Sequence, residues 1–278
     1  MKGQEYVSPF FVEAKHYEAV DNNGFCILDC DEAFHLCRML GIVSSKPIPS
    51  CYLRDFQALA HIGRVFEGAK DAGHKDGWGI TYFDKGIPTY LDRQPTDALK
   101  DERYAVALEK MESLQISGVV LAHLRRRSVG TVSMENTLPF THGTWAFAHN
   151  GTIFDFDAKI EGEREDVTDS KRFFQLLVRE IETGNSRVEE AIGRVVNNIR
   201  NTCRHSSLTF LLSNGAKLYA YRDFAEAKNE GYYSLMYAKE DGMVLFSQEP
   251  TWRKDWFTVS NRCLVIVDED LRINCVEL

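Results

Sequence analysis

The sequence lacks any run of about 18 apolar residues, the length that a membrane-spanning helix requires. Its first 36 residues have neither the basic start and apolar run of a signal peptide nor the arginine-rich character of a transit peptide. An excess of basic residues is also missing, because the net charge is −8. A general nucleic-acid-binding protein carries a dominant positive surface instead. We therefore expect a cytoplasmic protein that binds neither membrane nor nucleic acid.

A disulfide framework and a metal-binding motif are absent as well. The seven cysteines are an odd number with irregular spacing, which favours reduced thiols in a cytoplasm. The histidines form no His-x-His or His-Glu-x-x-His pattern. Cys26, Cys30 and His35 are three irregularly spaced potential ligands, which is weak support for a metal site. We expect no metal and no cofactor.

The sequence does contain 44% hydrophobic residues in a chain of 278, enough for a real core in one large domain or two small ones. The dipeptides Lys85-Gly86 and Asn214-Gly215 predict two β-hairpins, and the segments 170–182 and 187–200 predict two amphipathic helices. Groups of strands, a pair of helices and further antiparallel strands indicate a layered α+β domain. The predicted strands are 37–43, 78–84, 87–92, 118–124, 145–149, 208–212, 217–221, 232–238, 244–247, 263–267 and 273–276; helical patterns cover 53–66 and about 96–114, and 67–77 and 125–143 are expected to be loops.

Three separated motifs carry residue types that suit attack on a carboxamide. They supply a thiol at Cys37, a cation at Arg125 and an amide pair at Asn150-Gly151. These are a nucleophile, a partner for a carboxylate and donors for an oxyanion. Each motif alone also has an ordinary explanation: a buried strand cysteine, a solvated arginine cluster and a tight turn. The motifs therefore gain their meaning from occurring together.

In their order along the chain, these motifs resemble the class II glutamine amidotransferase domain, an N-terminal-nucleophile (Ntn) hydrolase, and in particular its small stand-alone branch. The motifs are Cys-Arg-x-Leu-Gly at 37–41, His-x-Asp-Gly-Trp-Gly at 74–79, the strand end at 121–125, the Asn-Gly pair at 150–151 and Val-Thr-Asp-Ser at 167–170. The resemblance runs from Cys37 to about Val259. It implies a four-layer αββα sandwich of two antiparallel sheets flanked by helices, formed by residues 37–278 after an N-terminal extension, residues 1–36.

The resemblance also implies roles for single residues. Cys37 is the nucleophile, and its own α-amino group, which titrates near about 7.7–8.0, accepts the proton of the thiol. The Asn150 side chain and the Gly151 N–H stabilise the oxyanion. Arg125 holds the α-carboxylate of the substrate through a planar fork of donors. Asp169 pairs with the α-ammonium group of the substrate, and capping of the following helix is its alternative role.

Further residues are assigned more loosely. Trp78 and Gly79 are expected to shape the pocket wall, although an aromatic residue at this position suits a core equally well. Leu138 stands where relatives usually carry His, which argues against an auxiliary polar role for that loop. Ser247-Gln248-Glu249-Pro250 resembles the Ser-Glu-Pro turn of the family. Asn214-Gly215 is assigned a turn and no catalysis.

The function implied is a Cys-dependent glutaminase or γ-glutamyl amidohydrolase that forms a γ-glutamyl thioester and releases glutamate with ammonia or an amine. No synthase domain fits in the rest of the chain, so ammonia transfer would need a separate synthase subunit, and a homodimer stays open. The alternative is a non-catalytic regulatory or binding protein of the same fold, since an acylated nitrogen on Cys37 is not a base. A papain-like Cys-His hydrolase fits poorly, because its nucleophile begins a helix.

The extension before Cys37 has two explanations. Residues 1–36 are either a propeptide removed at the Leu36–Cys37 bond or a segment that is not translated. Family members begin Met-Cys-Arg, Leu36 stands at the place of that Met, and some bacteria initiate at a leucine codon. Residues 31–33 can also be encoded with a purine run at ribosome-binding distance, and the extension lacks a hydrophobic period. We expect a mature protein that begins at Cys37.

Overall fold

The structure is a computed structural model that describes residues 37–65, 72–128, 130–154, 156, 167–240, 242–252 and 255–278. The extension 1–36, with Cys26, Cys30 and His35, lies outside the described residues, as do residue 66 of the expected helical pattern and residues 67–71 of the expected loop. In the described part of the chain, every helix is too short or too polar to cross a membrane.

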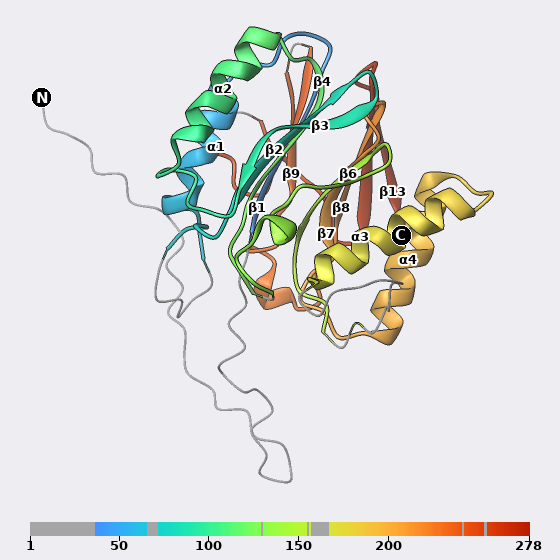
Figure 1. The fold of residues 1–278 in the computed structure, drawn as a ribbon. Coiled ribbons are helices and arrows are strands. Elements are labelled where there is room, and N and C mark those ends of the chain that lie inside the picture. The colour runs from blue at the N-terminus through green and yellow to red at the C-terminus, as the bar shows by residue number, and fades with distance from the viewer. Residues whose placement is uncertain are drawn as a thin grey trace, which may run out of the picture. The chain divides into compact units, whose positions relative to one another are not determined.

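The described strands form two antiparallel sheets (Figure 1). The first contains β1 (Arg38–Ser44), β2 (Trp78–Asp84), β3 (Ile87–Gln94), β4 (Gly118–Leu124), β9 (Met236–Glu240), β10 (Met243–Ser247) and β11 (Phe257–Thr258), in the order β11-β9-β10-β1-β4-β2-β3. The second contains β5 (Phe140–His142), β6 (Trp145–Asn150), β7 (Thr209–Ser213), β8 (Lys217–Arg222), β12 (Cys263–Asp268) and β13 (Ile273–Glu277), in the order β13-β12-β8-β7-β6-β5.

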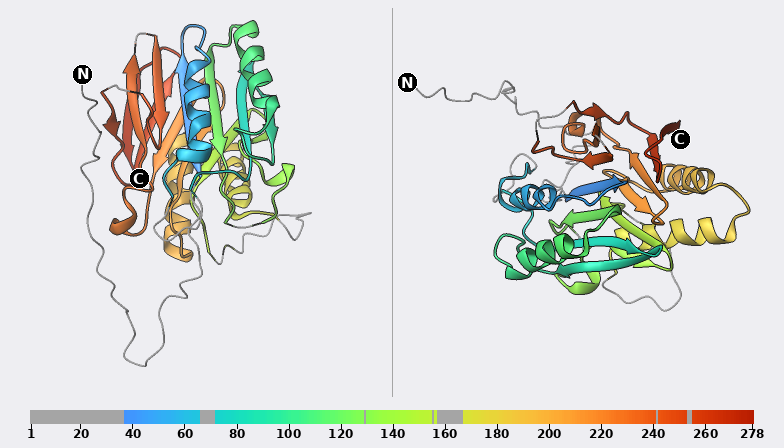
Figure 2. Two further views of the ribbon diagram at one scale, coloured as in Figure 1. Left: turned by 90° about the vertical axis from the view of Figure 1, so that its left-hand side faces the viewer. Right: turned by 90° about the horizontal axis from the view of Figure 1, so that it is seen from above.

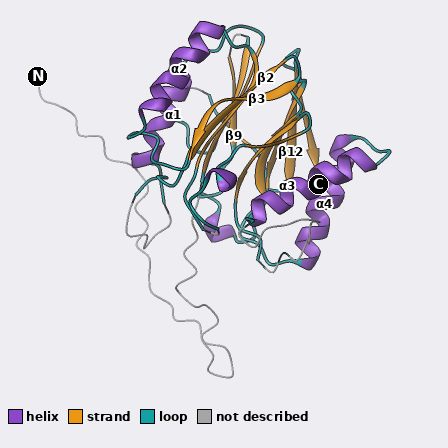
Figure 3. Cartoon of the chain, in the orientation of Figure 1, coloured by secondary structure: helices purple, strands orange, loops and turns teal. Residues whose placement is uncertain are grey.

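Helices cover the outer face of each sheet (Figures 1 and 3). The helices α1 (Cys51–Ile62) and α2 (Glu102–Leu114) lie on the first sheet, and α3 (Asp169–Thr183) and α4 (Val188–Thr202) lie on the second. The right view of Figure 2, from above, shows the same succession of helices, sheet, sheet and helices, and in the left view α1 and α2 lie in front of the first sheet.

Strand alternation divides the apolar side chains of the fold into three layers. On β1, Leu40 and Ile42 pack with the residues of α1 and α2, whereas Met39 and Val43 pack between the two sheets. On the far side, Phe147 of β6 packs in a layer with the apolar residues of α3 and α4. Each sheet is thus buried on both faces, which confirms the predicted four-layer αββα sandwich.

The hairpins and the α3–α4 pair form as predicted, and the differences have local causes. Helix α2 begins at Glu102 rather than near 96, because the Asp101 side chain accepts the N–H of Arg103 and caps the helix there. Strand β9 begins at Met236 rather than 232, because the preceding residues form turns after the short 3-10 helix η2 (Ala227–Asn229). The expected loop 125–143 contains β5 and the 3-10 helix η1 (Met134–Asn136).

Candidate active site

The topology brings the ends of three strands together at one edge of the sandwich. Strands β1 and β4 are antiparallel neighbours with Arg38 opposite Leu124, so Cys37, before β1, lies beside Arg125, after β4. Asn150 ends β6 in the facing sheet, and its side chain reaches Cys37 across 113 positions of sequence. Sequence-distant motifs therefore meet at one place.

A pocket at this edge contains most of the predicted site residues. Cys37, Arg125, Gly151 and Asp169 line it, and Asn150 contacts it through Cys37. The full lining is Cys37, Arg125, Arg126, Ser128, Asn136, Leu138, His149, Gly151, Thr168, Asp169 and Ser170.

Cys37 is half-buried and anchored at its nitrogen, oxygen and sulfur. Its backbone N–H donates to Asn150 Oδ1 at 3.0 Å, and its carbonyl accepts from Arg38 Nη1 at 2.9 Å. Its thiol donates to the carbonyl of Arg126 at 3.6 Å. Burial raises the pKa of the thiol to about 11 and outweighs the opposing effects of the Arg126 contact and the Arg125 cation. The thiol is therefore protonated at neutral pH and needs a base to become a nucleophile.

Asn150 and Gly151 form an unusual pair because both are tied to distant parts of the chain. Asn150 is fully buried, and its Oδ1 accepts the N–H of Cys37. Its Nδ2 atom has no hydrogen-bond partner among the residues described. A buried unpaired donor is costly and calls for an acceptor. A Cβ atom at Gly151 would lie 1.9 Å from the carbonyl oxygen of Ser207, so only glycine allows this close approach. The pair can offer amide hydrogen to a negatively charged oxygen in the pocket.

Arg125 presents a buried guanidinium to the pocket. Its Nη1 donates to the carbonyl of Thr131 at 2.9 Å, which fixes one side of the group. Burial lowers the pKa of Arg125, and the neighbouring Cys37 and Asp76 oppose that effect. An arginine stays charged under such conditions. The pocket thus contains a fixed cation suited to a carboxylate.

The sequence allowed Asp169 either to face the pocket or to cap the following helix, and in the structure Thr168 is the cap. Thr168 is the N-cap of α3, and its side chain accepts the N–H of Lys171 at 3.3 Å. Asp169 lines the pocket instead, and its Oδ2 accepts the N–H of Ile153 at 2.7 Å. Burial raises the pKa of the Asp169 carboxyl group to about 6. Asp169 is therefore ionised at neutral pH and becomes neutral in mild acid.

His149 is a neutral, buried histidine with both ring nitrogens hydrogen-bonded, and its place on the pocket wall was not predicted from the sequence. Its Nε2 is 3.4 Å from the carbonyl of Ser207, so Nε2 carries the proton, and its Nδ1 accepts from the Ser170 hydroxyl at 2.9 Å. Burial lowers its pKa to about 3. Both ring nitrogens are thus occupied away from Cys37, which argues against a papain-like Cys-His pair.

Trp78 and Gly79 lie elsewhere than on the pocket wall. Trp78 is buried beneath α2, where its indole N–H donates to Asp101 at 2.9 Å and its ring centroid lies 4.8 Å from that of Tyr104. A Cβ atom at Gly79 would lie 2.4 Å from the carbonyl oxygen of Leu138. Leu138 itself lines the pocket. Trp78 thus has the alternative core role, and Gly79 acts on the pocket only through the Leu138 backbone.

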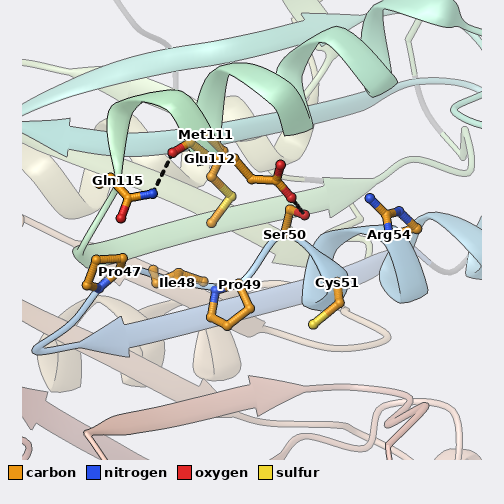
Figure 4. A pocket seen from close by; sticks show the side chains of 9 residues that line it. All are labelled: Pro47, Ile48, Pro49, Ser50, Cys51, Arg54, Met111, Glu112 and Gln115. Carbon is orange, nitrogen blue, oxygen red and sulfur yellow. Dashed lines mark hydrogen bonds between the residues drawn. The ribbon is translucent and has the colours of Figure 1, made fainter.

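A second pocket lies between the segment before α1 and the C-terminal end of α2 (Figure 4). The hydroxyl of Ser50 donates to the carboxylate of Glu112. Cys51, the thiol of this pocket, is exposed and points away from that carboxylate in Figure 4. This pocket therefore does not join a nucleophile to a base, and the pocket at Cys37 is the stronger candidate.

Known proteins resemble this chain in sequence and in fold. Residues 36–270 match the sequence model of the family described as glutamine amidotransferases class-II. The chain is 29% identical to YafJ of Escherichia coli (strain K12) over 197 residues, which cover 67% of this chain and 72% of YafJ. It is 27% identical over 237 residues to the gamma-glutamyl-hercynylcysteine sulfoxide hydrolase of Mycobacterium tuberculosis (strain ATCC 25618 / H37Rv), covering 84% of this chain and 94% of that protein.

A solved structure shares the fold. The glutamine phosphoribosylpyrophosphate amidotransferase from B. subtilis matches with a TM-score of 0.60 and 15% identity. The match covers 87% of this chain and 49% of that chain. At this identity the likeness concerns the fold alone, and it agrees with the two-sheet architecture described above.

Proposed function

The chain belongs to the class-II glutamine amidotransferases, and on that premise we propose that it cleaves a γ-glutamyl amide with Cys37 as the nucleophile. The observation that supports this most strongly is the position of Asn150. One end of its amide group binds the backbone nitrogen of Cys37, and the other end is a buried donor that lacks a partner in the described residues. One side chain thus links the nucleophilic residue to a donor that an oxyanion would satisfy.

The first step is attack of the Cys37 sulfur on the side-chain carbonyl carbon of the substrate. The thiol, with its pKa raised to about 11, passes its proton to a base. In the proposed reaction this base is the α-amino group of Cys37 itself, whose ordinary pKa near about 7.7–8.0 suits neutral pH. Asn150 Nδ2 and the Gly151 N–H stabilise the negative oxygen of the tetrahedral intermediate.

The second step breaks the carbon–nitrogen bond. The protonated α-amine gives its proton to the leaving nitrogen, ammonia or an amine departs, and a γ-glutamyl thioester remains on Cys37. Water then attacks the thioester carbonyl and gives a proton to the same amine. Collapse of this second intermediate releases glutamate, and the proton returns to the sulfur.

The amino-acid end of the substrate binds the two charged groups beside the nucleophile. Arg125 pairs with the α-carboxylate, and ionised Asp169 pairs with the α-ammonium group. Both side chains are buried and held by backbone contacts, so they are oriented before substrate arrives. Opposite charges on one small pocket select an α-amino acid.

Two fates of the released nitrogen fit this site. The match to the M. tuberculosis hydrolase, whose name specifies a γ-glutamyl compound, covers 94% of that protein and favours outright hydrolysis. Ammonia transfer would instead require a separate synthase subunit.

The proposed mechanism needs a free amine on Cys37. A peptide nitrogen does not act as a base, so we propose that the mature enzyme begins at Cys37. A chain that keeps the preceding residues would be a non-catalytic regulatory or binding protein of the same fold.

Labelling with a glutamine-like diazo-ketone tests the assignment. Cys37 alone should be labelled, and Cys37→Ala should lose labelling together with hydrolysis of glutamine and γ-glutamyl amides. Cys51→Ala and Cys203→Ala are the controls and should keep both. Labelling at Cys51 or Cys203 with activity intact would refute the role of Cys37.

A further inference from the structure

Arg38 joins three separate parts of the chain through one buried guanidinium. Its Nη1 donates to the carbonyl of Cys37 at 2.9 Å, and its Nη2 donates to the carbonyl of Arg64 at 2.6 Å. Its Nε donates to Glu249 Oε2 at 2.7 Å. A buried cation is costly unless it is paired and hydrogen-bonded, and these contacts meet that requirement.

Glu249 anchors the same cluster from the turn after β10. Its Oε2 also accepts the N–H of Arg64 at 2.9 Å, and its Oε1 lies 3.5 Å from Arg64 Nε. Its own N–H donates to the Ser247 hydroxyl at 3.3 Å, and Ser247 pairs with Leu40 of β1. The carboxylate therefore ties the end of α1 and the turn to the strand that follows the nucleophile.

Cys37 depends on side chains for its position because it precedes the β ladder. The register pairs of β1 with β4 begin at Arg38 opposite Leu124. The backbone of Cys37 is instead held by Asn150 at its nitrogen and by Arg38 at its oxygen. With a free amine, the residue would be a chain end, and the Arg38 side chain would hold its carbonyl group. A displacement of about 1 Å at a reacting atom can cost on the order of 10²-fold in rate.

We propose that Arg38 and Glu249 are a positioning pair that fixes the peptide plane of Cys37, so that its sulfur and amine face the substrate carbonyl. The inference rests on the function proposed above. Arg38 and Glu249 are not among the residues that line the pocket at Cys37. They act through the backbone of the nucleophile. Because Glu249 belongs to the Ser-Gln-Glu-Pro turn, this turn then has a role in the reaction.

Inactivation by the diazo-ketone analogue separates positioning from simple structural support. The rate constant of inactivation, kinact, and the reversible affinity, Ki, are measured for wild type, Arg38→Lys and Glu249→Gln, together with the labelled fraction by intact mass. Lysine keeps the charge of Arg38 but lacks its fork of donors. Glutamine keeps the shape of Glu249 without its charge.

Arg222→Lys is the matched control. Arg222 is also buried, and it donates to the backbone carbonyls of Tyr233, Val259 and Glu230 rather than to Cys37. The substitution changes a buried arginine but leaves the hydrogen bond between Arg38 and the carbonyl of Cys37 in place.

We expect kinact to fall about 10- to 100-fold in Arg38→Lys and Glu249→Gln, with Ki nearly unchanged and labelling that still reaches completion. Arg222→Lys should keep the wild-type kinact even where its labelled fraction falls. The labelled fraction reports how much of a partly folded variant is folded. Glu249→Asp is a third variant of the pair. Wild-type kinact in these variants would overturn the positioning pair and leave the proposed function intact. A wild-type chain that is not labelled at Cys37 would overturn both.

Discussion

The chain contains two Asn-Gly pairs, and the structure uses them in different ways. Asn214-Gly215 closes the β7–β8 hairpin, where the Asn214 side chain accepts the N–H groups of Ala216 and Lys217. Gly215 has a φ of +85°, the left-handed conformation that favours glycine. The Asn214 side chain thus finds its hydrogen-bond partners within three residues, and the local sequence alone predicts the turn.

Asn150-Gly151 has long-range partners instead. Its asparagine binds Cys37 and keeps a buried amide donor without a partner in the described part of the chain. Its glycine is needed because the Ser207 backbone approaches, rather than because of a local turn. The two pairs differ because the fold leaves a buried polar atom of Asn150, and none of Asn214, as a candidate to bind a ligand.

The largest difference between the two pairs should be in kcat. Asn150→Ala removes the proposed oxyanion donor and should lower kcat by about 10²–10³-fold. Asn214→Ala removes the same side chain from a turn and should leave kcat unchanged. Steady-state kinetics on glutamine or a γ-glutamyl amide measure both, and a normal kcat in Asn150→Ala would refute the oxyanion role.

Substrate binding around the first pair gives the next effect. Arg125→Ala and Asp169→Ala each remove a charged partner of the amino-acid end and should raise KM by about 10- to 100-fold. Some loss of kcat is expected as well, because binding energy also orients the substrate. Unchanged KM values in both variants would show that this end of the substrate binds elsewhere.

The pH dependence should show Asp169 directly. Its pKa is raised to about 6, and the proposed role needs the ionised carboxylate, so kcat/KM should lose a factor of about ten per pH unit below 6 from this group. The proposed α-amine base must also be neutral and adds a second decline on the acid side. Asp169→Asn should therefore have a shallower acid limb than wild type. Identical limbs in the two proteins would contradict the role of Asp169.

The smallest predicted effect is the difference between the two glycines in the free energy of unfolding lost on substitution. Gly151→Ala forces a methyl group against backbone and should cost about 1–3 kcal/mol or more in the free energy of unfolding, with loss of activity. Gly215→Ala meets the Phe83 side chain at 2.8 Å and a left-handed backbone, and should cost about 1–2 kcal/mol with activity retained. Denaturant unfolding compares them, and equal losses of activity would remove the distinction.

The sequence predicted those parts of the fold that depend on near neighbours. The hairpins at Lys85-Gly86 and Asn214-Gly215 and the helices α3 and α4 follow from turn chemistry and periodicity. The placement of β1 between β10 and β4 does not, because pairing between distant strands has no local signal. The four-layer arrangement of two sheets flanked by helices came from family resemblance, and the strand order within each sheet was not predicted.

The candidate site shows the same division. Cys37, Arg125, Asn150 and Asp169 stand at strand or helix ends in recognisable motifs. The carbonyl of Arg126, by contrast, contributes a backbone atom that any residue carries. The roles of His149 and of the Arg38–Glu249 pair depend on contacts made only in the folded chain. Trp78 was assigned to the wall because its motif lies near the site, whereas its side chain lies on the opposite side of the sheet with α2.

In the proposed mechanism, Cys37 supplies both the attacking sulfur and the accepting amine to one carbonyl group held by Asn150 and Gly151. The N-terminal residue of the active enzyme, isolated from its native host and labelled with the diazo-ketone analogue, tests this most directly. We expect residue one to be Cys37, with a free α-amine and the label on its sulfur. Active enzyme labelled at Cys37 that still carries the preceding residues would contradict it.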